Sequence, residues 1–204
     1  ETASEADRYL LFADDYRGTV TEASLNGAVP PTPVIPTVLP IHQHREEIMD
    51  AIGASKVTVL QGDTGTGKSS QLPQFIIKAH RYARVVVTQP RRLAAVSLAR
   101  RVASEMNQPL GEQVGFRIGG ERTVSPKTRI TYVTTGWMLQ YLTFLQASDG
   151  SREFPFTHVI LDEVHERSVD GDLVTMLLRR IVDDSDHQLS SLAPNMKLIL
   201  MSAT

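Results

Sequence analysis

The segment Gly62-Asp-Thr-Gly-Thr-Gly-Lys-Ser69 carries the strongest structural signal in the sequence. It fits the pattern G-x-x-x-x-G-K-[ST], whose glycines let the backbone curl so that successive amide groups face a phosphate. The β-branched residues before it, 56–61, predict a strand, and residues 68–80 after it predict an amphipathic helix. Strand, loop and helix in this order are the context of a phosphate-binding loop. The sequence therefore predicts that residues 62–69, here called the P-loop, bind a nucleotide.

Each part of the P-loop has a chemical role. The N-terminus of the following helix carries partial positive charge and Lys68 adds a full charge, so both attract phosphate oxygens. The Ser69 hydroxyl is suited to magnesium. The alternative is a glycine-rich turn that binds nothing, and the spacing of Lys-Ser after a strand disfavours it. The expected nucleotide-binding residues are Gly62, Asp63, Thr64, Gly65, Thr66, Gly67, Lys68, Ser69 and Ser70.

From residue 41 onward, short β-branched runs alternate with longer amphipathic stretches, which is typical of stacked βαβ units. Several of the runs are apolar on both faces, as in a parallel sheet covered by helices. The predicted fold is therefore α/β, a mostly parallel sheet with helices on both faces. The predicted strands are 56–61, 84–88, 129–134, 157–162 and 197–201, and the predicted helices are 42–52, 68–80, 92–106, 136–146 and 171–182.

Residues 1–40 differ in composition from the rest of the chain. Residues 1–28 are polar and acidic, and five prolines lie between Val29 and Pro40. Proline removes amide donors and favours extended chain, so this segment reads as an N-terminal extension and linker. A proline-rich ligand for another protein is the alternative. The expected domain is residues 41–204.

Composition narrows the class of protein. The chain has 204 residues, enough for one domain, and no cysteine, which excludes disulfides and thiolate zinc sites. It has no apolar run near the ~20 residues that a membrane-spanning helix needs, and residues 1–30 lack the features of a signal peptide. We expect an intracellular protein with no membrane partner, in either the cytoplasm or the nucleus.

Charge is unevenly distributed along the chain. Residues 78–129 carry 11 basic against 3 acidic side chains, a local excess of +8 in a chain of net charge −2. Lysine and arginine neutralise phosphates and release counterions, so this basic block indicates a surface for a polyanion. A solvated basic face balanced by acidic neighbours is the alternative.

Two carboxylates follow a second apolar run. Asp162 and Glu163 come at the end of the predicted strand 157–162, on the side where α/β sheets bind ligands. A first acid there can hold magnesium and a second can orient the water that attacks the γ-phosphate. Such a pair is commonly a helix cap or solvated loop when it stands alone, but the P-loop favours the catalytic interpretation.

The order of motifs resembles the DEAH-box family of superfamily 2 RNA helicases. Asp162-Glu-Val-His165 resembles the DEAH box, and Thr88-Gln-Pro-Arg-Arg92 with the residues to Ala95 resembles motif Ia. Thr134-Thr-Gly136 resembles motif Ib, and Ser202-Ala-Thr204 is the motif III tripeptide. The resemblance covers about residues 38–204 and implies a RecA-like ATP-binding domain, the first of two such domains, with ATP and Mg²⁺ as cofactors.

The resemblance also implies roles for single residues. Lys68, Asp162, Glu163 and His165 would be catalytic, with Ser69, Asp162 and Glu163 near the metal and His165 coupling the nucleotide state to a second domain. Arg101 would stack on adenine, although a surface arginine is the alternative. The expected nucleic-acid contacts are Gln89, Pro90, Arg91, Arg92, Thr134 and Gly136.

The function expected from this resemblance is an ATP-dependent RNA helicase motor that unwinds RNA or remodels ribonucleoprotein. It would bind single-stranded RNA regardless of sequence and act together with a second RecA-like domain and with protein cofactors. The alternatives are a DNA helicase and a nucleotide-gated RNA-binding scaffold that does not unwind. Adenylate kinases and transporter-type P-loop proteins are disfavoured because they lack the Thr-Gln-Pro-Arg-Arg and Ser-Ala-Thr segments.

Some positions depart from the family pattern. Thr135 and Trp137 replace the usual residues around motif Ib, and Trp137 is either a core residue, which we favour, or a base-stacking one. Related DEAD-box proteins read adenine with a glutamine at the position of Arg45, so we expect loose discrimination among nucleotide bases. His42 and His44 are interpreted as surface residues, because a metal site needs further ligands.

Overall fold

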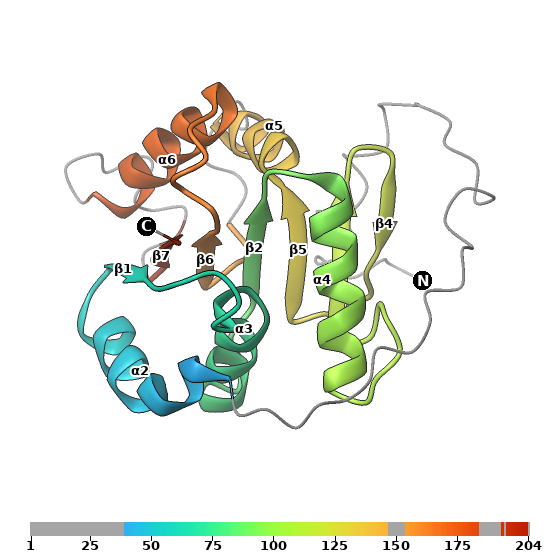
Figure 1. Cartoon of the computed structure of the whole chain (residues 1–204). Coiled ribbons are helices and arrows are strands. Elements are labelled where there is room, and N and C mark those ends of the chain that lie inside the picture. Colours follow the sequence, from blue (N-terminus) through green and yellow to red (C-terminus); the bar gives the residue numbers. More distant parts are fainter. Residues whose placement is uncertain (1–38, 147–153, 184–192, 194, 204) are drawn as a thin grey trace.

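One seven-stranded sheet lies at the centre of the computed structural model, which describes residues 39–146, 154–183, 193 and 195–203 (Figure 1). The strand order is β1-β7-β6-β2-β5-β3-β4, and every neighbouring pair is parallel except β3 and β4. The strands are β1 (Val57–Gln61), β2 (Val85–Gln89), β3 (Val114–Ile118), β4 (Glu121–Thr123), β5 (Ile130–Thr134), β6 (His158–Leu161) and β7 (Lys197–Ser202). The predicted extension and most of the linker, residues 1–38, lie outside the described residues.

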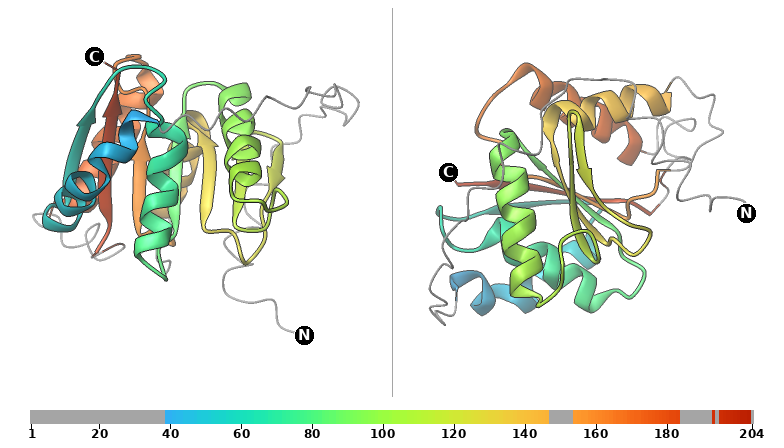
Figure 2. Two further views of the ribbon diagram at one scale, coloured as in Figure 1. Left: turned by 60° about the horizontal axis from the view of Figure 1, so that its bottom comes forward. Right: turned by 90° about the vertical axis from the view of Figure 1, so that its right-hand side faces the viewer.

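Helices cover both faces of the sheet, which confirms the predicted fold class. They are the 3₁₀ helix η3 (Pro40–His44) and the α-helices α2 (Arg45–Ala54), α3 (Lys68–Ala79), α4 (Arg92–Glu105), α5 (Thr135–Gln146) and α6 (Val169–Val182). Figure 2 shows α2, α3 and α4 on one face and α5 and α6 on the other. None of the helices in the described part of the chain is long and apolar enough to cross a membrane.

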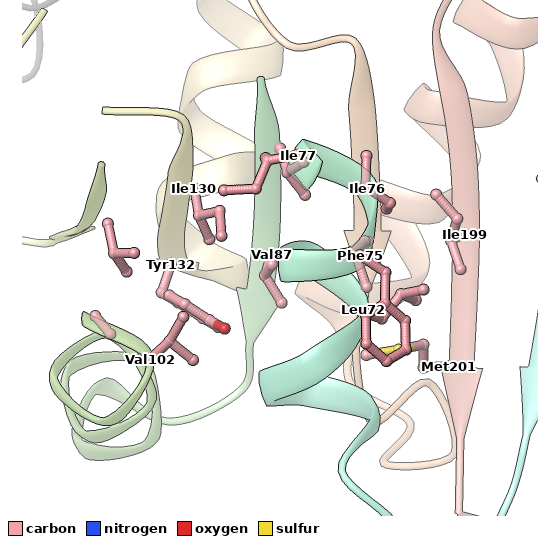
Figure 3. Packing of buried hydrophobic residues seen from close by; sticks show 14 of the residues in the cluster. Leu72, Phe75, Ile76, Ile77, Val87, Val102, Ile130, Tyr132, Ile199 and Met201 are labelled. Atoms are coloured by element: carbon pink, nitrogen blue, oxygen red, sulfur yellow. The ribbon is translucent and has the colours of Figure 1, made fainter. Parts of the chain in front are cut away.

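The sheet separates two hydrophobic clusters. On one face, Leu72 and Ile76 of α3 pack against Val87, Ile199 and Met201 of the sheet (Figure 3). On the other face, helices α5 and α6 pack on the outer side of β2, β5, β6 and β7. The central strand β2 is buried along its whole length because both of its faces are covered. This two-sided burial explains why the apolar runs were recognisable as strands.

The β3–β4 hairpin is an addition that the sequence pattern did not predict. Strand β3 contains Gly115 and Arg117, so it lacks the continuous apolar pattern of its neighbours. Glycine is needed at position 115 because a Cβ there would collide with the carbonyl oxygen of Thr123 on β4. Arg117 is buried with its guanidinium 5.7 Å above the ring of Trp137. The hairpin extends the sheet beyond β5 and ends it at an antiparallel edge.

Candidate nucleotide site and nucleic-acid interface

The P-loop connects β1 to α3, as predicted. Gly65 and Gly67 have φ angles of +84° and +97°, a backbone conformation that side chains disfavour. Gly67 has a second constraint, because a Cβ there would lie 2.8 Å from Cδ1 of Leu39. The Ile41 amide donates to the Thr66 carbonyl oxygen at 3.2 Å, so the chain entering η3 packs directly on the loop. Glycine at these positions is thus required by the loop's own geometry.

Lys68 is held inside the P-loop and is only 9% exposed. Its ammonium group donates to the carbonyl oxygens of Gly62 and Asp63, the latter at 2.9 Å. The Thr66 hydroxyl also donates to the Asp63 carbonyl, at 2.8 Å. An ammonium group has three donors, so Lys68 can turn them from loop carbonyls to phosphate oxygens without leaving the loop. A groove of about 510 Å³ opens beside it, lined by residues of η3, α2, β1 and the P-loop.

Asp162 lies at the end of β6 and is 7% exposed. Its two carboxylate oxygens have different partners: Oδ2 accepts from Nε2 of Gln89 at 2.5 Å, and Oδ1 accepts from the Glu163 amide at 3.0 Å. Glu163 has a φ of +56°, an unusual value for a residue with a side chain. This backbone conformation separates the two acids: Asp162 is buried in the sheet edge, whereas the Glu163 side chain is about a third exposed.

His165 lies between Glu163 and the end of β7. Its Nε2 is 3.3 Å from Oε2 of Glu163, and its Nδ1 accepts from the Ala203 amide at 3.4 Å. The Ser202 hydroxyl is also 3.4 Å from Nδ1. Because Nδ1 is an acceptor here, the neutral ring carries its proton on Nε2, facing Glu163. His165 therefore joins the DEVH segment to Ser202 and Ala203, while Thr204 lies outside the described residues.

Backbone hydrogen bonds hold these three segments at one edge of the sheet. The Gly62 amide donates to the Ser202 carbonyl at 3.2 Å, and the Val164 amide donates to the Met201 carbonyl at 3.1 Å. Strand β7 is thus the bridge between the P-loop strand β1 and the acidic strand β6. The parallel order places the C-terminal ends of all three strands together, where α/β sheets bind ligands.

The oxygen ligands at this edge fit Mg²⁺ bound together with a nucleotide. Among the described residues, no group of three or more His, Cys, Asp or Glu side chains could hold a metal by itself. Magnesium is usually bound by one or two protein oxygens, with phosphates and water completing its coordination. The Asp162 carboxylate and the Ser69 hydroxyl are donors of this kind. The predicted role of Glu163 at the metal is less direct, because its carboxylate faces His165.

Arg101 lies on α4 beside the helix that starts at the P-loop. Its Nε donates to Oε1 of Glu105 at 2.9 Å, and the Arg101 side chain is 59% exposed. The other oxygen of Glu105 accepts from Gln71 at 2.8 Å and from Gln74 at 2.9 Å, both on α3. The Glu105 carboxylate therefore links Arg101 to the P-loop helix α3. The flat face of the Arg101 guanidinium is available to a base. The sequence pattern did not predict this link through Glu105.

The predicted nucleic-acid contacts divide into exposed and buried side chains. Arg91 and Arg92 follow β2 and are exposed, Arg91 at 3.1 Å from Glu166 and Arg92 at 3.8 Å from Glu121. Pro90, between Gln89 and Arg91, is also exposed. Gln89 is different: its side chain is 3% exposed and turned towards Asp162. Gln89 is still part of β2, which is covered on both faces, and so its side chain points inward.

The end of β5 and the start of α5 hold the remaining predicted contacts. The Thr134 hydroxyl accepts from the Trp137 amide at 3.3 Å, which caps the first turn of α5. Gly136 has open space around it apart from a carboxylate oxygen of Asp170, which a Cβ would meet at 3.4 Å. Trp137 is 7% exposed and stacks on Tyr141 with the ring centroids 5.1 Å apart. It is therefore a core residue, the interpretation favoured from the sequence.

The residues around η3 contact aromatic and acidic side chains. His42 packs edge-on against the ring of Phe75 at 5.2 Å, and His44 is exposed near Glu47. The Arg45 guanidinium lies 5.5 Å above the same Phe75 ring. Arg45 is thus engaged with α3 in the place where relatives that read adenine have glutamine.

Comparison with known proteins identifies the family. A sequence profile described as DEAD/DEAH box helicase matches residues 42–204. The chain is 45% identical over 175 residues to the "Probable ATP-dependent RNA helicase spindle-E" of Anopheles gambiae, covering 84% of this chain and 11% of that protein. It is 41% identical over 170 residues to the "Probable ATP-dependent RNA helicase DHR2" of Saccharomyces cerevisiae, covering 81% and 22%.

A solved structure gives the same result. The crystal structure of the Escherichia coli DEAH/RHA helicase HrpB superposes with a TM-score of 0.69 at 33% sequence identity, covering 81% of this chain and 20% of that one. The chain spans between about a tenth and about a fifth of the length of these relatives. The residues that match the profile include both the P-loop and the DEVH segment. The chain belongs to the DEAD/DEAH box helicase family.

Proposed function

We propose that this chain is the ATP-binding motor domain of an ATP-dependent RNA helicase, which uses ATP hydrolysis to unwind RNA or remodel ribonucleoprotein. One observation carries the proposal: the P-loop, the DEVH segment and Ser202–Ala203 meet at neighbouring strand ends and are joined by hydrogen bonds. The names of the relatives, which describe ATP-dependent RNA helicases, support it. An intracellular location is part of the same proposal.

The nucleotide would bind with its phosphates at the P-loop. The loop amides and Lys68 would hold the phosphate oxygens, and the N-terminus of α3 would add partial positive charge. Magnesium, held by Ser69 and Asp162, would neutralise charge on the β- and γ-phosphates when bound. Arg101 lies on the adjacent helix, where its exposed guanidinium can stack on the base.

Hydrolysis requires a positioned water molecule, and Glu163 is the residue that we assign to it. Oε2 of its carboxylate lies 3.3 Å from Nε2 of His165, a close contact that would limit its orientation relative to Asp162. His165 is in turn fixed by Ser202 and Ala203 at the end of β7. If a neighbouring domain moved the end of β7, the movement would therefore be transmitted to Glu163 through the side chain of His165.

RNA would bind along the exposed residues that follow β2. Arg91 and Arg92 pair with Glu166 and Glu121 in exposed positions, and such ion pairs are worth only about 0–1 kcal/mol. Phosphates can therefore replace the carboxylates at low cost. Contacts of this kind position the strand without reading its sequence, so we infer binding to single-stranded RNA of any sequence.

A second RecA-like domain is the partner that the site needs. The P-loop edge is open on the side of the 510 Å³ groove, and the relatives have ample length for further domains. We infer that ATP is enclosed between the two domains and that the second supplies positive charge to the γ-phosphate. Protein cofactors would act on this closed state.

The test is nucleotide binding by a matched pair of lysine variants. Lys68→Ala should abolish binding of ADP and ATP without unfolding the domain, because the Lys68 ammonium group contacts the loop's own carbonyl oxygens and not the hydrophobic core. Lys78→Ala, which removes an exposed lysine near the other end of the same helix, should bind normally. Normal binding by Lys68→Ala, or no binding by the unmodified protein, would overturn the proposed nucleotide site.

A further inference from the structure

The buried contact between Gln89 and Asp162 connects two motifs to which the family resemblance gives separate tasks. Nε2 of Gln89 donates to Oδ2 of Asp162 at 2.5 Å, and neither side chain is more than 7% exposed. A hydrogen bond to an ionised acceptor is about twice as strong as one between neutral groups. The resemblance assigns Gln89 to nucleic acid, whereas the structure turns it towards the carboxylate expected to hold magnesium.

The two hydrogen bonds to Asp162 fix the plane of its carboxylate. Oδ1 is held by the Glu163 amide and Oδ2 by the Gln89 amide group, one donor on each oxygen. Each oxygen can accept a second contact, so the carboxylate remains able to bind a cation or its water. With only the Glu163 amide, the group could rotate about its terminal bond.

Gln89 is itself held by the neighbouring strand. It pairs with Thr134 in the β2–β5 register, and the Thr135 hydroxyl donates to the Gln89 carbonyl oxygen at 3.3 Å. Strand β2 lies between β5 and β6 in the sheet, as Figure 1 shows. Gln89 therefore connects β5, which ends in motif Ib, with β6, which is followed by Asp162. The next residues in the chain are Pro90 and the exposed Arg91.

We propose that Gln89 is a positioning residue for Asp162, setting the carboxylate for Mg²⁺-dependent nucleotide binding, with Thr135 holding Gln89 in place. The inference rests on the proposed function, since it assumes that Asp162 holds the metal of a bound nucleotide. Residues that orient a metal ligand typically change metal affinity by about 10–100-fold when mutated. Gln89 would act through Asp162 and not by touching the nucleotide.

The experiment measures ADP binding by the 204-residue protein while Mg²⁺ is varied, and again in EDTA. Gln89→Met keeps the length of the side chain and removes the donor. It should raise the Mg²⁺ concentration at half-saturation by about tenfold or more and leave ADP affinity in EDTA unchanged. Thr135→Val, which removes only the hydroxyl, should shift the Mg²⁺ midpoint in the same direction by a smaller factor.

Gln74→Met is the matched control. Gln74 is buried to the same 3% exposure and also donates to a carboxylate, that of Glu105 on α4. It should lose stability as Gln89→Met does and keep the unmodified Mg²⁺ midpoint. An unchanged midpoint in Gln89→Met or, if that variant does not fold, in Thr135→Val would overturn the inference. No ADP binding, or none that depends on Mg²⁺, by the unmodified protein would instead overturn the proposed function.

Discussion

The hydroxyl group of Tyr132 donates a hydrogen bond to the carbonyl oxygen of Ser69 at 2.8 Å. In a regular helix that oxygen would accept from the amide four residues later, but residue 73 is proline and has no amide hydrogen. Tyr132, fully buried on β5, supplies the missing donor to the first turn of the P-loop helix. Burial, helped by the negative charges of Asp162 and Glu105, raises the pKa of Tyr132 well above its usual value, so the hydroxyl stays protonated.

We therefore expect Tyr132→Phe to destabilise the domain by about 1–3 kcal/mol, the cost of leaving a buried acceptor without a partner. The measurement is urea unfolding followed by circular dichroism. Tyr82→Phe serves as the control, because Tyr82 is 84% exposed and its hydroxyl should not matter. Equal stability of the two variants would show that water or a shifted helix satisfies the Ser69 carbonyl.

Much of the fold could be predicted from the sequence because its signals are local. The five predicted strands and the five predicted helices are all present, and their ends differ from the predicted ones by at most three residues. The β3–β4 hairpin was missed because Gly115 and Arg117 interrupt its apolar pattern. Arg117 is buried with its guanidinium 5.7 Å above the ring of Trp137, a contact between separate elements that no local pattern indicates.

The candidate site divides in the same way. Spacing and residue type indicated the P-loop and the Asp162–Glu163 pair. The inward orientation of Gln89 could not be predicted, because it depends on the register that pairs β2 with both β5 and β6. The links from Tyr132 to Ser69 and from Glu105 to α3 also depend on packing between elements. The sequence thus indicated the groups that contact a ligand better than the groups that hold them.

The pH dependence of stability should report on His158. Burial, together with the positive charges of His80 and Lys197, lowers the pKa of His158 from 6.5 to about 4. A lowered histidine pKa means that the unfolded chain binds the proton more tightly than the folded one, so stability is complete above pH 6.5. It should fall between about pH 6.5 and about pH 4, by up to about 3 kcal/mol in total.

The check is the unfolding free energy from about pH 7.5 to about pH 4 for the unmodified protein and for His158→Gln. Other groups titrate in both proteins, so the informative quantity is the difference between the two curves. That difference should shrink or reverse as the pH falls, since glutamine takes up no proton. A difference independent of pH would mean that His158 protonates equally well in the folded and unfolded states.

RNA binding should depend on the pair Arg91 and Arg92. Replacing both with alanine should weaken binding equally for unrelated single-stranded oligonucleotides and lower the salt slope by about 1.4, which is about 0.7 for each phosphate that is no longer neutralised. The control is the pair Arg179→Ala and Arg180→Ala, which removes the same charge from the last turn of α6. Weakening confined to one oligonucleotide sequence would indicate base readout.

Arg101 should contribute to nucleotide affinity through its flat guanidinium. Arg101→Ala should weaken ADP binding by about five- to thirtyfold, corresponding to about 1–2 kcal/mol for a cation stacked on a ring. ADP and GDP should lose affinity to a similar extent, because stacking does not distinguish the bases and Arg45 takes the place of an adenine-reading glutamine. The neighbouring exposed arginine gives the control Arg100→Ala, expected to bind normally. A strong preference for ADP in the unmodified protein would contradict loose base discrimination.

Finally, the 204-residue protein should bind ATP but hydrolyse it slowly, even with RNA present. Charge that develops on the transferring phosphoryl group needs positive groups on both sides, and an arginine supplied by a partner domain is worth about 10³–10⁵ in rate. Two arginines that follow strands β6 and β2 form ion pairs with other groups, Arg167 with Asp172 and Arg91 with Glu166.

Arg179 and Arg180 lie in the last turn of α6, at the end of the helix opposite the segment that follows Asp162. Glu163 can align a water molecule, but the charge on the phosphoryl group then lacks its counterpart on the open side of the site. The measurement is phosphate release by this protein and by a longer one that includes the proposed second RecA-like domain, with Glu163→Gln as the blank. RNA-stimulated turnover of the shorter protein at the rate of the longer one would show that this domain carries out the chemistry unaided.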